Sequence, residues 1–229
     1  MAASRVRAVT LAAGLVAWNG LVDPRLPARW QPLVRAVLGS ALMFGTGARP
    51  GLRPPALWSG VRLGAAVATA VSAGVAATSA VPIVRTGMRE KTLPAEPGSW
   101  LLLRIPLGTV WPEEAAYRAA LGKVGAEAFG TTGGQVLQAA AFGLSHIADA
   151  RAAAQPVIPT VLVTGVAGWV FGRLAQRSAS LAAPMLAHLA INEAGALAAL
   201  ACQAVPTGLP PRGSRPWRSG ATRWASRNR

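Results

Sequence analysis

The sequence predicts an all-α protein, a polytopic transmembrane helical bundle of roughly six to eight helices. Charged residues make up only 14% of the 229 residues, whereas a soluble globular chain carries about 25%. The uncharged residues gather in long runs, since no Asp, Glu, Lys or Arg occurs in residues 63–84 or 152–172. A helix crosses the roughly 30 Å core of a bilayer with about 20 apolar residues. Both runs are therefore long enough to span a membrane.

Apolar stretches, separated by Pro and Gly, give the expected order of helices. The first follows Arg5 and Arg7 and resembles a signal peptide, but no clear small-residue cleavage site follows it, so we interpret it as a retained helix. The expected helices are 7–22, 32–46, 61–84, 99–128, 132–150, 156–174 and 179–204. We divide the chain into N-terminal membrane helices and connectors (1–98), a membrane core (99–205) and a basic tail (206–229).

The net charge of +15 is carried by residues between the apolar runs and in the tail. Such cations face lipid headgroups and set topology, and because no aromatic–basic platform accompanies them we expect no nucleic-acid partner. The tail has six Arg, no acid, and many Pro, Gly and Ser, which is typical of a disordered segment. We expect it to lie in the cytoplasm and to bind anionic lipids.

Orientation of the N-terminus stays open, because the connectors 23–35 and 47–62 each carry three Arg. The Ala-, Gly- and Arg-rich composition indicates a bacterial plasma membrane protein. The single cysteine, Cys202, permits no internal disulfide.

Three polar motifs interrupt apolar helices in the second half of the chain. Ionisable groups inside membrane segments are costly, so each motif is a candidate functional site. The motifs contain both histidines of the chain. They are Glu113-Glu114-Ala115-Ala116-Tyr117-Arg118, Phe142-Gly143-Leu144-Ser145-His146 and His188-Leu189-Ala190-Ile191-Asn192.

Spacing within the first motif distinguishes its two glutamates. Residues four apart on a helix lie on nearly the same face, so Glu114 and Arg118 can pair within their own helix. Glu113 points about 100° away around the axis and is free to face another helix. An interfacial ion pair without a task is the alternative reading of this motif.

Spacing within the other two motifs predicts pairs as well. His188 shares a face with Asn192, and Phe142 lies one turn before His146, where it can wall one side of the ring. Each motif alone is also explained by ordinary interhelical hydrogen bonding. All three together favour one polar cavity within the bundle.

The ordered motifs EExxxR, FxxxH and HxxxN resemble those of the CPBP family of intramembrane proteases. That family includes CAAX prenyl endopeptidases and bacterial proteins linked to bacteriocin processing or immunity. The resemblance covers about residues 99–195, and it departs from the family at Tyr117-Arg118-Ala119, where Phe-Arg-Gly is common. There is no HExxH motif and no suitable Asp pair, so other intramembrane protease types fit less well. A Ser145–His188 dyad is the remaining alternative among them.

The resemblance implies that the chain is an endopeptidase that acts on a membrane-anchored peptide or protein. Glu113 would be the general base, assisted by His146, and His188 with Asn192 would stabilise the oxyanion. The supporting residues would be Glu114, Arg118 and Phe142.

A divalent metal such as zinc is an alternative within the same family. Glu113, His146 and His188 would then be three ligands with an open fourth position. We favour the version without a cofactor, because each polar group already has a role without an ion.

Two functions of other classes also fit the polar motifs. One is a catalytically silent scaffold or immunity protein of the same fold, against which the intact set of polar residues argues. The other is a transporter or proton pathway lined by the same groups. Many transporters are built from internal repeats, and the absence of a repeat in this sequence argues mildly against this function.

Overall fold

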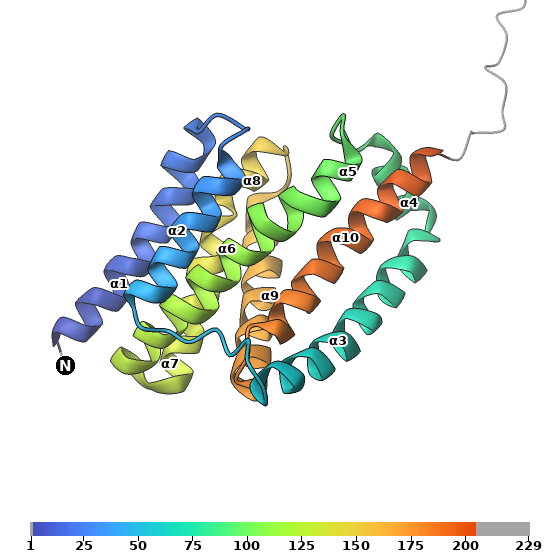
Figure 1. Ribbon diagram of the computed structural model, residues 1–229. Helices are drawn as coiled ribbons and strands as arrows, with labels where there is room; N and C mark the ends of the chain where they lie inside the picture. Colours follow the sequence, from blue (N-terminus) through green and yellow to red (C-terminus); the bar gives the residue numbers. More distant parts are fainter. Residues whose placement is uncertain (1, 205–229) are drawn as a thin grey trace, which may run out of the picture.

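The computed structural model describes residues 2–204, and in this part of the chain every regular element is helical, without a strand (Figure 1). The N-terminal half contains α1 (Ala2–Ala17), α2 (Gln31–Gly45), α3 (Ala56–Ser79) and α4 (Pro82–Glu90). A π-helical turn, Trp18–Val22, and a 3-10 turn, Asp23–Arg25, extend α1. The predicted all-α bundle is confirmed. The expected basic tail, 206–229, lies outside the described residues.

The C-terminal half begins with one long helical run that alternates between α and π geometry. It comprises α5 (Pro97–Ser99), the π-helical segments Trp100–Arg104 and Pro106–Val110, α6 (Trp111–Glu113), the π-helical segment Glu114–Leu121, and α7 (Gly122–Ser145). Then follow α8 (Ile147–Ala152), α9 (Val157–Ser178) and α10 (Ala182–Ala204).

Three of the described helices are long and apolar enough to cross a membrane, namely α3, α9 and α10. Their outward faces are apolar as well, since the side chains of Ile158 and Val163 on α9 are 73% and 68% exposed. A lipid environment accepts such a face, whereas water would not. The chain is therefore an integral membrane protein.

The long run around residues 97–145 folds back on itself at Gly130. Its φ of +73° is a left-handed conformation that glycine adopts without strain. Beyond the turn, Gly134 lies so close to the first arm that a Cβ there would be 2.4 Å from the backbone nitrogen of Ala126. The predicted division between the helices 99–128 and 132–150 is thereby confirmed.

Two predicted helices end earlier in the structure than expected. The helix expected at 61–84 ends at Ser79, and Pro82 begins α4 instead, because a proline lacks the N–H that would continue the hydrogen-bond ladder. The helix expected at 132–150 ends at Ser145, and His146 sits between α7 and α8 with φ −87° and ψ 4°. The uncharged run therefore gave the right length for α3 but placed it five residues too late, since the helix begins at Ala56. The histidine marks a break.

The packing brings the motif-bearing helices to the middle of the bundle. α10 packs against α3 and α9, while α7 packs against α9 and α1. α2 packs against α6 and the two π-helical segments that flank it. In Figure 1 the long run containing α6 crosses the bundle between the α1–α2 pair and the α3–α10 pair.

Candidate active site

The first motif occupies a change of helix geometry at the centre of the bundle. Glu113 is the last residue of α6, and Glu114 begins the π-helical segment. Wide helical turns of this kind are frequent at functional sites. A close approach of α2 positions the segment, since a Cβ on Gly39 would lie 2.7 Å from the carbonyl oxygen of Pro112.

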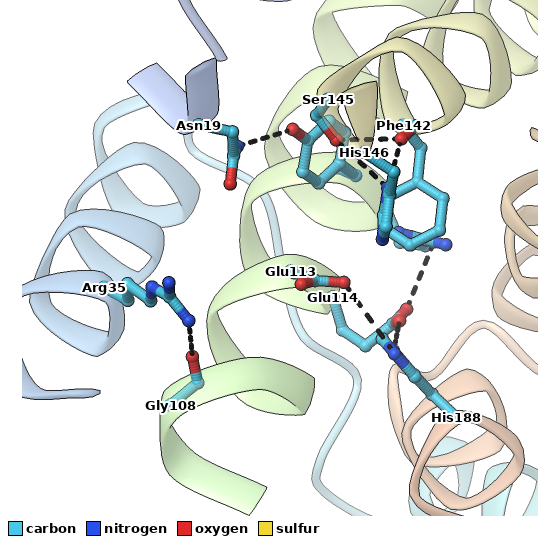
Figure 2. A network of polar contacts seen from close by, with 11 residues as sticks. Asn19, Arg35, Gly108, Glu113, Glu114, Phe142, Ser145, His146 and His188 are labelled. Carbon is cyan, nitrogen blue, oxygen red and sulfur yellow. Dashed lines mark hydrogen bonds and ion pairs between the residues drawn. The ribbon is translucent and has the colours of Figure 1, made fainter. Parts of the chain in front are cut away.

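Glu114 is the hub of a buried polar cluster (Figure 2). Its Oε1 lies 2.8 Å from His188 Nδ1, and its Oε2 lies 3.3 Å from Arg118 Nε. The Arg118 guanidinium also stacks 3.9 Å above the ring of Phe142. The pairing of Glu114 with Arg118 predicted from spacing is confirmed, and the bond to His188 is an addition that the spacing did not reveal.

The ring of His188 faces a carboxylate with each of its two nitrogens. Nδ1 contacts Glu114, while Nε2 lies 3.7 Å from Glu113 Oε2. Phe171 on α9 stacks on the imidazole with ring centroids 4.9 Å apart and an interplanar angle of 25°. The histidine is therefore fixed in orientation between the two glutamates.

The ring of His146 is oriented by the helix that it ends. Its Nδ1 lies 2.7 Å from the carbonyl oxygen of Phe142, and the two rings meet edge to face at 4.7 Å. A carbonyl only accepts hydrogen bonds, so Nδ1 carries the proton, and in a neutral ring Nε2 is left as an acceptor. Phe142 also lies edge-on to His188 at 6.2 Å, so both histidines are on the same side of the bundle.

A polar cavity of about 270 Å³ brings Glu113 and His146 together. His188 and Asn192 are not among its lining residues; His188 approaches Glu113 directly instead. Asn192 lies one turn along α10 from His188, and in the described part of the chain its buried Nδ2 has no hydrogen-bond partner.

Side chains from the N-terminal helices close the other side of this cavity (Figure 2). Asn19 donates from Nδ2 to the hydroxyl of Tyr117 at 3.1 Å. Arg35 donates from Nε to Asp23 at 2.7 Å and from Nη1 to the carbonyl of Gly108 at 3.4 Å. The motifs did not reveal these residues, although a polar Asn19 inside an apolar stretch was a usable signal.

The residues expected as metal ligands do not form a ligand set here. Among residues 2–204 no group of three or more His, Cys, Asp or Glu side chains is arranged to hold a metal ion. Nδ1 of His188 is held by Glu114, and Nδ1 of His146 by the Phe142 carbonyl. A metal at this site would therefore be held through the Nε2 atoms of the two histidines.

Comparison with known proteins identifies the part of the chain that carries these residues. No curated protein and no solved structure matches the chain. Residues 95–194 match the family model described as type II CAAX prenyl endopeptidase Rce1-like. This range contains all three motifs and agrees with the resemblance drawn from them. Residues 95–194 of this chain are therefore similar to the Rce1-like type II CAAX prenyl endopeptidases.

Proposed function

We propose that the protein is an intramembrane endopeptidase that hydrolyses a peptide bond in a membrane-anchored peptide or protein. The observation that carries the proposal is the position of Glu113, which shares a cavity with His146 and lies 3.7 Å from His188. The match of residues 95–194 to a family model of endopeptidases supports the same reaction class.

Glu113 is the general base in this proposal. Its side chain lines the cavity and is 24% exposed, so a water molecule in the cavity can approach it, while its Oε2 is buried beside His188. The cavity has room for that water, which needs about 10–15 Å³. Nε2 of neutral His146 would accept a hydrogen bond from the same water or receive its proton. A positioned base of this kind contributes about 10²–10⁴ in rate.

His188 and Asn192 supply the donors for the oxyanion. His188 donates from Nδ1 to Glu114, and a positively charged ring also donates from Nε2, which the oxyanion role requires. The unpartnered amide of Asn192 is a second, neutral donor. Preorganised donors in a water-poor site are frequently the largest contribution to catalysis of acyl transfer.

Glu114, Arg118 and Phe142 hold this machinery in position. Glu114 orients the His188 ring, Arg118 balances the charge of Glu114, and Phe142 packs between Arg118 and His146. In this division of roles Glu113 and His146 are left free for proton transfer.

The substrate class follows from the membrane setting. The matched family model is described as type II CAAX prenyl endopeptidase. For this chain we propose the broader class of membrane-anchored peptides or proteins.

The test is comparative membrane proteomics of three strains, expressing wild-type protein, Glu113→Ala, or no protein. The proposal predicts peptide termini that occur only with the wild type and are lost equally in the other two strains. Glu90→Gln, which changes an exposed acid on α4, is the matched control and should preserve them. A scaffold or transporter would yield no termini that depend on Glu113.

A further inference from the structure

An acidic residue that the proposed mechanism does not use lies in the middle of a membrane-spanning helix. Glu193 is the central residue of α10, with eleven residues of the helix on either side. At about 1.5 Å per residue it lies roughly 16 Å from each end, which is close to half of the roughly 30 Å core of a bilayer. Because α10 is long and apolar enough to cross a membrane, Glu193 belongs near the bilayer midplane.

The carboxylate of Glu193 has no partner within the described part of the chain. Among residues 2–204 its side chain makes no hydrogen bond and no ion pair. The side chain is half-buried, and neither oxygen is among the buried polar atoms that lack a partner. Both oxygens are therefore accessible from outside the bundle. The neighbouring Asn192 differs, because its Nδ2 is buried in the protein, and consecutive residues of a helix point about 100° apart.

The surface of α10 around Glu193 is apolar. A groove of about 200 Å³ is formed by α10, α3, the π-helical segment Pro106–Val110 and Leu52, and all of its lining residues are apolar. Leu189 belongs to this lining, and Glu193 follows it by one turn on the same side of the helix. One turn further on, Leu197 is 53% exposed. Glu193 therefore interrupts an apolar stripe of α10, which lies between α3 and the long run that contains α6 (Figure 1).

An unpaired carboxylate at this depth is costly. Ionisable groups inside membrane segments are rare, and they usually pair with an opposite charge or line a functional path. A cation from outside the chain can reach Glu193, and apolar side chains next to that cation can enter the adjoining groove. We propose that the face of α10 around Glu193 binds a transmembrane helix of another protein, with a Lys or Arg of that helix paired to Glu193.

Charge complementarity favours this occupant over a second copy of the chain. A symmetric dimer through this face would bring two Glu193 carboxylates together, and like charges disfavour each other. The other two helices that can span a membrane carry their cations away from the middle. Arg62 lies in the first third of α3, and Arg173 and Arg177 lie in the last third of α9. A partner helix with a central Lys or Arg supplies the counter-ion at the required depth.

The first test measures binding of a synthetic helix to the full-length protein in phosphatidylcholine liposomes. The probe is a Leu/Ala transmembrane peptide with one central Lys, and energy transfer between labelled peptide and labelled protein reports binding. This peptide should bind about 3- to 30-fold more tightly than one with Leu in place of Lys, which is the range that interhelical polar contacts supply. Glu193→Gln should remove most of the preference, and Glu193→Lys should transfer it to a peptide with a central Glu.

The second test asks whether Glu193 serves the fold of its own chain. Glu193→Leu removes an unpaired carboxylate from the span, so without peptide its melting temperature should equal or exceed that of the wild type. It should also bind the Lys and Leu peptides equally. Glu127→Gln is the matched control, because Glu127 is an exposed acid outside the three helices that can span a membrane, and it should keep the full preference for the Lys peptide.

Three results would overturn the proposal. Equal binding of the Lys and Leu peptides to the wild type would show that Glu193 recognises no cation. A lower melting temperature of Glu193→Leu without peptide would give the carboxylate a structural role within the chain. Self-association of the wild type that is lost in Glu193→Leu would make a second copy the occupant. None of these measurements uses cleavage, so failure here is distinguishable from failure of the proposed protease activity.

Discussion

Replacing Glu114 by Gln should destabilise the protein much more than a similar change at the surface. The side chains of Glu114 and Arg118 are both 0% exposed. The glutamine can still accept from His188, but the charge of Arg118 is left without its counter-ion. Stranding one member of a buried pair costs about 3–5 kcal/mol of unfolding free energy. For a chain of this size that corresponds to roughly 6–20 °C in melting temperature.

The assay is the unfolding free energy in detergent, measured for three variants. Glu127→Gln breaks the Lys123–Glu127 pair, which has the same four-residue spacing but is 38% and 48% exposed, and should cost only about 0.3–0.5 kcal/mol. Glu114→Gln/Arg118→Met strands no charge and should recover most of the loss. The reasoning is refuted if Glu114→Gln stays within about 1 kcal/mol of the wild type, or if the double variant is the least stable of the three.

Three further predictions concern the packing and the chemistry of the site. Gly39→Ala places a methyl 2.7 Å from the carbonyl oxygen of Pro112, so it should lower stability by about 1–3 kcal/mol and also reduce turnover. A methyl in the control Gly45→Ala, on the same helix, meets nothing within 4 Å. Equal effects of the two changes would contradict the prediction. Phe171→Leu removes the ring stacked on His188 and should lower stability by about 0.5–1.5 kcal/mol and also reduce cleavage; a change in melting temperature alone would limit Phe171 to packing. Dialysis of purified protein against a chelator should leave cleavage unchanged, whereas a loss restored by added zinc would require a metal-dependent mechanism.

The helices and the similarity to the matched family were predictable because their signals are local. Uncharged runs locate α3 and α9, and four-residue spacing pairs Glu114 with Arg118. The end of α3 at Ser79 was predictable in principle from Pro82. The helix break at His146 was not predictable, because the hydrogen bond from its ring to the Phe142 carbonyl forms only where the helix ends.

The rest of the site depends on contacts between distant segments. The bond between Glu114 and His188 joins residues 74 positions apart, and Asn19 reaches Tyr117 over 98 positions. The spacing of residues within one helix does not predict contacts between residues this far apart in the sequence. Phe171 lies in an apolar run, where nothing distinguishes a ring stacked on a histidine from one facing lipid. The domain boundaries at 98/99 and 205/206 remain predictions.

The central claim is that Glu113, and not its neighbour, activates the water. The direct measurement is cleavage of a membrane-tethered peptide library by purified protein in liposomes, together with the melting temperature of each variant. Glu113→Gln should keep the wild-type melting temperature and lose at least about 10² in turnover, because the amide cannot accept the proton. Glu90→Gln should match the wild type in both. Full activity of Glu113→Gln beside a folded but inactive Glu114→Gln would reverse the two roles, and normal cleavage by both would contradict the glutamate mechanism.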